Sequence, residues 1–270
     1  MAEMNQDILQ KEEQFHDSWA ETIDVDNLPV DEFFEACTAP ENRWLLEKLG
    51  DLTGRKVLEL GCGAGEASIY LAKKGADVTA TDLSGGMLKV VERLAKKHDV
   101  SVKTHKTDAD QIDFPDGTFD IVYAANLLHH VDIGKTLDEA CRVLKPGGIF
   151  CSWDPIAHNP AINVYRRIAT EVRTEDEHPL RMKDLKLFSK HFSKVEYATF
   201  WFFTLWIFIR FYFIERVDPN KERYWKKIIT EHQKLEPRYN RLERLDRRFF
   251  RLFPFLRRYA WNIAVIATKG

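Results

Sequence analysis

Short apolar runs alternate with helical patterns over residues 56–154. The apolar runs have the length of strands, and they are KVLEL (56–60), ADVTAT (76–81), VSVKTHK (100–106), FDIVYA (119–124) and GIFCSWD (148–154). The segments between them place apolar residues three or four positions apart, as amphipathic helices do, and they are 65–74, 84–98 and 134–144. This alternation predicts an α/β fold with a mostly parallel sheet and helices on both faces.

The flanking regions predict a helical lid, two further strands and a helical insertion. Residues 1–50 have a helical pattern, a helix is expected near 181–190, and strands near 193–199 and 261–268 would complete a seven-stranded sheet. We therefore expect a single domain over 1–270, divided into a lid (1–50), a core (54–154), a substrate region with a strand (155–199), a helical insertion before the last strand (200–258) and that strand (261–268).

Composition and charge narrow the functional classes. The 270 residues include 40 basic and 42 acidic side chains, and the net charge of -2 creates no global field that would attract nucleic acid. The basic residues are concentrated, however, with 14 Lys and Arg against 6 Asp and Glu in 216–258. The opening residues are acidic and polar, and the 4 cysteines lack the spacing of metal ligands, which predicts a cytoplasmic protein without a signal peptide.

The string VLELGCGAGEAS (57–68) carries the most specific chemical signal. An apolar run ends there at Leu60, and the three glycines after it permit the tight turn and close backbone approach that a bound nucleotide requires. Asp82 ends the next run, where a carboxylate can accept both hydroxyls of a ribose. The spacing G-x-G-x-G followed by Glu66 differs from the dinucleotide fingerprint G-x-G-x-x-G, and it favours a ligand that carries positive charge.

Residues 54–154 resemble the class I S-adenosylmethionine-dependent methyltransferases, which have a Rossmann-like fold. The resemblance rests on ELGCGAG (59–65), TATDLS (79–84), TDADQIDFPDGTFD (107–120), NLLHHV (126–131) and RVLKPGG (142–148). It implies S-adenosyl-L-methionine as the cofactor, with Asp82 at the ribose and Asp108 near the adenine amino group. The implied cofactor-binding residues are Glu59, Gly61, Cys62, Gly63, Gly65, Asp82, Leu83, Asp108, Ala109 and Asn126.

Two histidines after the fourth strand and an acid at the end of the fifth are candidate catalytic groups. Ligands of open parallel sheets bind at the carboxyl ends of the strands, so His129, His130 and Asp154 would border the methyl group. Some O-methyltransferases of this fold use a His–Asp pair here, which makes His130 the predicted base and Asp154 the residue that orients it. Histidines that only pack or cap a helix are the alternative, and a metal site that includes His158 is a weaker one.

Further polar and aromatic residues are candidates for contact with the substrate. They are His16, Trp19, His129, Tyr165, Arg166 and His178, with Arg173 as an additional candidate. The arginines suit a carboxylate or phosphate, although a solvated, salt-bridged loop is the alternative. Phe15, His16 and Trp19 would form a lid over the cofactor, or would simply pack a helix on the sheet.

The insertion begins with FWFFTLWIFIRFYFI (200–214), which holds 9 of the 33 aromatic residues. A spanning helix needs about 20 apolar residues, so this segment either roofs an apolar pocket or dips into one leaflet. The basic amphipathic stretch after it favours contact with an anionic membrane surface, whereas packing on neighbouring helices is the alternative. Nucleic acid is a weaker third interpretation.

Together these patterns predict a methyltransferase that acts on a small hydrophobic or amphiphilic acceptor, lipid-like or isoprenoid-like. We expect the protein in the cytoplasm, and peripheral attachment to the inner face of the membrane is a further expectation. A soluble sugar or natural-product methyltransferase, whose insertion only caps the pocket, is the first alternative. A protein that binds the cofactor without transferring a methyl group is the second alternative. A nicotinamide oxidoreductase is disfavoured, because the third glycine of the dinucleotide fingerprint G-x-G-x-x-G is missing from its position.

Overall fold

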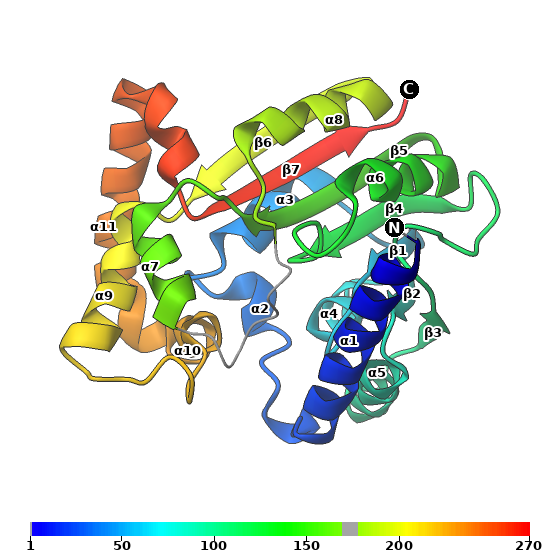
Figure 1. Cartoon of the computed structure of the whole chain (residues 1–270), viewed down its shortest axis with the longest axis horizontal. Coiled ribbons are helices and arrows are strands. Elements are labelled where there is room, and N and C mark those ends of the chain that lie inside the picture. Colours follow the sequence, from blue (N-terminus) through cyan, green and yellow to red (C-terminus); the bar gives the residue numbers. More distant parts are fainter. Residues whose placement is uncertain (1, 169–177) are drawn as a thin grey trace.

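A seven-stranded mixed sheet forms the centre of the computed structural model, which describes residues 2–168 and 178–270 (Figure 1). The strands are β1 (Lys56–Leu60), β2 (Asp77–Asp82), β3 (Val102–Lys106), β4 (Phe119–Ala125), β5 (Leu144–Pro155), β6 (Lys194–Phe200) and β7 (Asn262–Thr268). Their order is β3-β2-β1-β4-β5-β7-β6, and β7 runs antiparallel to both of its neighbours. The predicted α/β fold with a mostly parallel sheet is confirmed.

The strands occupy the apolar runs because those runs are covered on both sides. In β1 and β4 nearly every side chain is buried. β3 lies at the edge of the sheet, and its side chains are more polar and only partly buried or exposed. One boundary differs from the prediction. β5 begins at Leu144, inside the segment expected to be a turn, because the backbone there already pairs with Phe119 before the register shifts.

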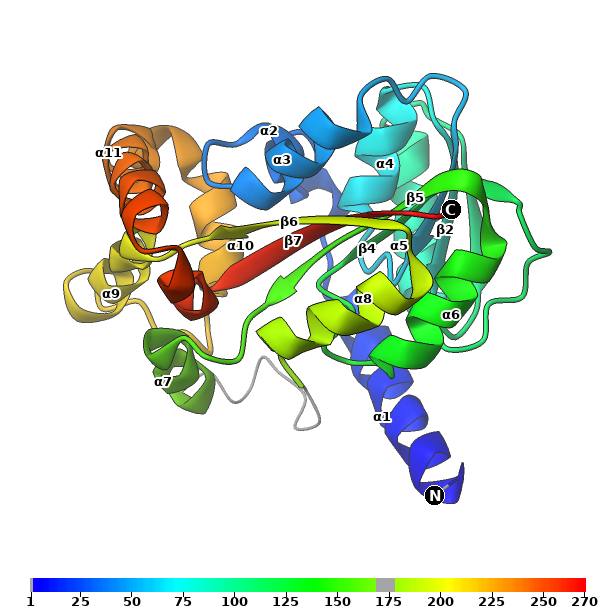
Figure 2. The same cartoon turned by 90° about the horizontal axis from the view of Figure 1, so that it is seen from above.

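Helices cover both faces of the sheet (Figure 2). They are α1 (Ala2–Glu21), α2 (Glu32–Glu35), α3 (Pro40–Leu49), α4 (Glu66–Lys73), α5 (Gly85–Lys97), α6 (Ile133–Val143), α7 (Pro160–Ile168), α8 (Leu185–His191), α9 (Trp206–Phe213), α10 (Tyr224–Thr230) and α11 (His232–Leu252). The first hydrophobic core joins the sheet to α3, α4 and α5, and the second joins its other face to α6 and α8.

The N-terminal helices are fixed to the sheet by buried polar contacts. The hydroxyl of Tyr123 on β4 donates to Asn42 Oδ1 on α3 at 2.7 Å, and Asn262 Nδ2 on β7 donates to Glu41 Oε1 at 2.7 Å. On α1, Asp17 accepts hydrogen bonds from the side chain of Ser84 at 2.5 Å and from the N–H of Gly86 at 2.9 Å. These contacts place α1 beside the carboxyl ends of the central strands.

The insertion folds around a small core of its own. The inward face of α9, with Ile207, Phe208 and Phe211, packs against Tyr224 of α10 and Tyr239 of α11. Buried Asp246 on α11 accepts hydrogen bonds from the backbone N–H groups of residues 202–204, the nearest at 2.6 Å, and fixes the turn before α9. The aromatic segment 200–214 therefore packs partly on protein, as one of the two interpretations predicted.

The outer surface of the insertion stays apolar. We define the aromatic patch as the exposed side chains of Phe203, Trp206, Leu245, Phe253 and Phe255. The ring of Phe253 contacts the ring of Phe255 on one side and the half-buried ring of Phe249 on the other. Phe249 in turn contacts Phe203. A groove of about 340 Å³ with almost wholly apolar walls runs between α7, α9 and α11 within this patch.

Candidate active site

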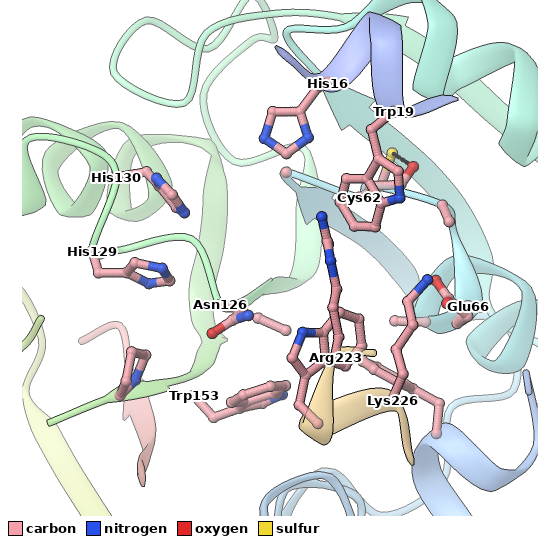
Figure 3. A pocket seen from close by; sticks show the side chains of 18 of the residues that line it. His16, Trp19, Cys62, Glu66, Asn126, His129, His130, Trp153, Arg223 and Lys226 are labelled. Atoms are coloured by element: carbon pink, nitrogen blue, oxygen red, sulfur yellow. Dashed lines mark hydrogen bonds between the residues drawn. The ribbon is translucent and has the colours of Figure 1, made fainter. Parts of the chain in front are cut away.

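A cavity of about 250 Å³ lies at the carboxyl ends of β1, β4 and β5, between α1, α7 and α10 (Figure 3). Its walls are largely aromatic, and they comprise Phe15, Trp19, Phe33, Trp153, Tyr165, Trp225 and Trp261. Its polar groups comprise His16, Glu59, Glu66, Asn126, His129, His130, Arg166, Arg223 and Lys226. An apolar cavity with a few convergent polar groups is typical of a small-molecule site.

The glycine turn after β1 forms one wall of this cavity. Gly61, Gly63 and Gly65 have φ angles of +62°, +50° and +88°, a region that L-residues with side chains rarely adopt. A Cβ on Gly65 would meet Val91 Cγ2 at 2.7 Å, whereas a Cβ on Gly63 would meet nothing within 4 Å. The turn at Gly63 therefore leaves open space that a ligand can approach closely.

Glu59 is the acid at the base of the cavity. It is 3% exposed and accepts a hydrogen bond from the hydroxyl of Ser68 on α4. Burial raises the pKa of Glu59 to about 8, because the charged carboxylate loses its hydration there. A ligand with a positive charge near this carboxyl would favour its ionised form.

The structure pairs Asp154 with His129. His129 Nδ1 lies 2.9 Å from Asp154 Oδ1, the backbone N–H of His129 donates to the same oxygen at 3.3 Å, and both side chains are buried. Burial raises the pKa of Asp154. The prediction that Asp154 orients His130 is therefore wrong. The turn after β4 directs the imidazole of His130 toward α1 instead, where its Nδ1 lies 3.5 Å from Glu12 Oε1.

The structure brings most of the predicted site residues into one cavity. Those that line it are His16, Trp19, Glu59, Gly61, Cys62, Gly63, Asn126, His129, His130, Tyr165 and Arg166. Asn126 has a φ of +58° and holds this edge by donating its N–H to the carbonyl of Trp153 at 2.7 Å. Left-handed backbone is uncommon outside glycine, although Asn tolerates it better than most residues.

Other predicted residues lie outside the cavity. They are Gly65, Asp82, Leu83, Asp108, Ala109, Asp154 and His178. Both oxygens of Asp82 accept backbone N–H groups, from Gly63 at 2.9 Å and from Ser84 at 2.9 Å, and the adjoining turn is covered by Asp17 of α1. His178 is exposed, and its backbone N–H donates to the carbonyl of His129 at 2.7 Å. Arg173 lies outside the described residues.

Several residues of the site were not predicted from the sequence. Arg223 and Lys226 lie three positions apart on the same side of α10 and project into the cavity. Their spacing was a usable signal, but the surrounding basic stretch favoured a surface helix. Across residues 2–168 and 178–270, no group of three His, Cys, Asp or Glu side chains could hold a metal ion.

Comparisons with known proteins match the core of this fold. A family model described as a methyltransferase domain matches residues 58–152. A ubiquinone biosynthesis O-methyltransferase from Pseudomonas aeruginosa is 36% identical over 132 residues, which cover 47% of this chain and 55% of that protein. A demethylmenaquinone methyltransferase from Clavibacter sepedonicus is 38% identical over 119 residues, 43% of this chain and 46% of that protein.

A solved structure extends the likeness beyond the matched core. Phosphoethanolamine N-methyltransferase 2 from Haemonchus contortus, in complex with S-adenosyl-L-methionine, has a TM-score of 0.57 over 86% of this chain and 52% of that chain, at 22% identity. Residues 58–152 therefore form a methyltransferase domain of the class I S-adenosylmethionine-dependent type. The chain spans about half the length of the curated relatives it matches, and the family model ends before α7 and the insertion begin.

The glycine turn of this methyltransferase fold gives a first prediction. Gly63→Ala should abolish binding of S-adenosylhomocysteine, because its methyl group enters the open space of the cavity, while the free energy of unfolding falls by only about 1–2 kcal/mol. Gly65→Ala should destabilise the fold more, because its methyl group meets Val91 as well. Isothermal titration and denaturant unfolding measure the two effects.

Gly117→Ala is the matched control, since Gly117 also has a positive φ, of +62°, and nothing within 4 Å of a Cβ, but lies outside the cavity wall. It should keep the affinity of the wild-type protein. A Gly63→Ala protein that bound S-adenosylhomocysteine as tightly as Gly117→Ala would contradict this account of the turn.

The raised pKa of Glu59 gives a pH dependence. The unfolded chain releases this proton near pH 4.5, whereas the folded protein keeps it up to about pH 8. The folded state therefore binds more protons between these values, and the free energy of unfolding should fall as the pH rises through that window. Glu59→Gln should make this slope shallower, as measured by denaturant unfolding across the window.

Glu47→Gln, which changes an exposed acid on α3, serves as the control and should leave the slope unchanged. Buried Glu41, whose pKa burial raises to about 7, should keep part of the slope in both variants. Identical slopes in the wild type and Glu59→Gln would refute the assignment of the raised pKa to Glu59.

Proposed function

We propose that this protein transfers a methyl group from S-adenosylmethionine to a small amphiphilic acceptor at a membrane surface. The observation that carries the proposal is a single cavity that joins the glycine turn to the space between its aromatic walls. We call this space the aromatic chamber, and His129 lies at its edge. The cofactor side and the acceptor side of a methyl transfer would therefore meet without an intervening wall.

The residues of the cavity fit this cofactor. Gly61 and Gly63 provide a wall without side chains, and Glu59 provides an acid that suits a cationic ligand. When bound, S-adenosylmethionine supplies an electrophilic methyl group on a positively charged sulfonium. The indoles of Trp153 and Trp261 exclude water and restrict the approach of an acceptor, and such positioning can supply much of the rate enhancement in a displacement reaction.

His129 is the better placed of the two histidines to accept a proton. Its Nδ1 is held 2.9 Å from Asp154 Oδ1, so a proton taken up at Nε2 would produce an imidazolium that Asp154 stabilises. A hydroxyl acceptor needs such a base, and general-base assistance is worth about 10²–10⁴-fold. Among the described residues, the carboxylate beside His130 is Glu12, whose Oε1 lies 3.5 Å from His130 Nδ1, so this contact is looser than the His129–Asp154 pair.

The surface beside the cavity supports an amphiphilic acceptor. The aromatic patch and its groove adjoin α7, which also contributes to the wall of the cavity. Arg248, Arg251 and Arg258 are exposed and lie within three residues of Leu245, Phe253 or Phe255 in the sequence, and such basic residues suit the interface of an anionic membrane. Within the described residues, no helix combines the length and apolarity needed to cross a bilayer. The names of two relatives, ubiquinone biosynthesis O-methyltransferase and demethylmenaquinone methyltransferase, also support an apolar acceptor.

Cofactor with a labelled methyl group tests the proposal. Purified protein and labelled S-adenosylmethionine are incubated with the membrane and soluble fractions of the source cells, and the products are partitioned between solvents. Label should appear in the organic phase of the membrane fraction. His129→Gln should lower the initial rate by about 10²-fold or more without weakening S-adenosylhomocysteine binding, because only the proton acceptor is removed.

Two surface variants separate membrane contact from catalysis in the same assay. Phe253→Ser/Phe255→Ser should lower incorporation from membranes several-fold, whereas Tyr197→Ser, at an exposed aromatic on β6, should not. Label in the aqueous phase would instead support a sugar or polar natural-product acceptor. Cofactor binding without any transfer would leave a binding protein of the same fold.

A further inference from the structure

Two cations from the insertion enter the candidate active site. The guanidinium of Arg223 extends from the start of α10 toward Trp19 and His16, and Lys226, one turn later, extends toward Glu66 (Figure 3). Arg223 Cζ lies 4.0 Å from the centre of the Trp19 ring, and Lys226 Nζ lies 5.2 Å from the same centre. One indole on α1 therefore holds both positive groups close together.

The positive charges of Arg223 and Lys226 are poorly neutralised inside the cavity. Both side chains are half-buried, and among the residues that the structure describes neither forms an ion pair with a carboxylate. Burial lowers the pKa of Lys226. The negative charge of Glu66 acts against this lowering, and the positive charge of Arg223 adds to it. Cation–π contact with Trp19 compensates only partly for two adjacent charges removed from water.

We propose that Arg223 and Lys226 form a binding site for an anionic group, a carboxylate or a phosphate, within the methyl-transfer cavity. Arginine presents a planar fork that such groups accept in two parallel hydrogen bonds, and lysine adds a mobile point charge. An anion between them would neutralise both cations and replace their lost hydration. This inference rests on the proposed function, because it specifies the chemistry of a molecule bound in the same cavity.

The anionic group has two possible sources. The cofactor carries a carboxylate on its amino-acid end, and the acceptor can carry a carboxylate or phosphate of its own. Lys226 points to Glu66 on the side of the glycine turn, while Arg223 reaches the middle of the cavity, so the pair spans both halves. The chemistry of recognition is the same for either source, and binding experiments can distinguish them.

Isothermal titration of the 270-residue chain provides the test, in the free state and saturated with S-adenosylhomocysteine. The acceptor arm compares decanoate and decyl phosphate with decanol, and we expect the anionic amphiphiles to bind the wild type about ten-fold tighter or more. The cofactor arm compares S-adenosylhomocysteine with 5′-methylthioadenosine, which lacks the carboxylate. Arg223→Gln/Lys226→Gln should remove the preference for the anionic ligand in at least one arm.

Matched variants exclude simpler explanations. Lys221→Gln/Arg238→Gln removes the same charge from exposed positions of the insertion and should keep every preference. Trp19→Leu removes the indole contact but keeps both cations. If Arg223 and Lys226 bind an anion, rather than serving only to connect α1 to α10, this variant should keep the anion preference.

Each outcome has a defined meaning. Loss of the preference for decanoate and decyl phosphate assigns the site to the acceptor, and loss for S-adenosylhomocysteine alone assigns it to the cofactor. Equal affinities of the double variant and its charge control in both arms would overturn the proposal. If the wild type failed to bind S-adenosylhomocysteine, the proposed function would fail, while the comparison of anionic and neutral amphiphiles in the free protein would still test this site.

Discussion

The hydrogen bond from the N–H of Gly63 to Asp82 Oδ2, at 2.9 Å, determines how the rest of the site is arranged. The other oxygen of the same carboxylate accepts the N–H of Ser84, so one buried group fixes both the turn after β1 and the start of α5. Asp17 of α1 then binds Ser84 and Gly86 on that turn. The glycine turn, the helix that covers it and the cavity between them therefore form one connected unit.

The sequence was sufficient for the fold because the fold is encoded by local patterns. Each central strand is a short apolar run followed by a helical period, and the glycines at 61, 63 and 65 adopt the positive φ angles that their spacing suggested. The aromatic residues of 200–214 were harder to interpret. The segment uses Ile207 and Phe208 for packing and leaves Trp206 exposed, so packing accounts for only part of its apolar surface.

The side-chain pairing inside the site was not predictable by the same means. His129 and His130 are neighbours in the chain, and only the path of the turn after β4 decides which of them meets Asp154. Arg223 and Lys226 approach Trp19 from a position about two hundred residues away in the sequence. Such contacts depend on how separate elements dock, and a pattern within one element contains no information about that docking.

A crystal structure of the protein with S-adenosylhomocysteine would test the central claim most directly. The account predicts the ligand in the cavity between α1 and α10, with its adenosine end toward Asp82 and Asp108 and its thioether on the side of Asn126 and His129. That orientation would direct a transferred methyl group into the aromatic chamber. A ligand bound elsewhere, or bound with its thioether turned away from His129, would contradict the assignment of this cavity to methyl transfer.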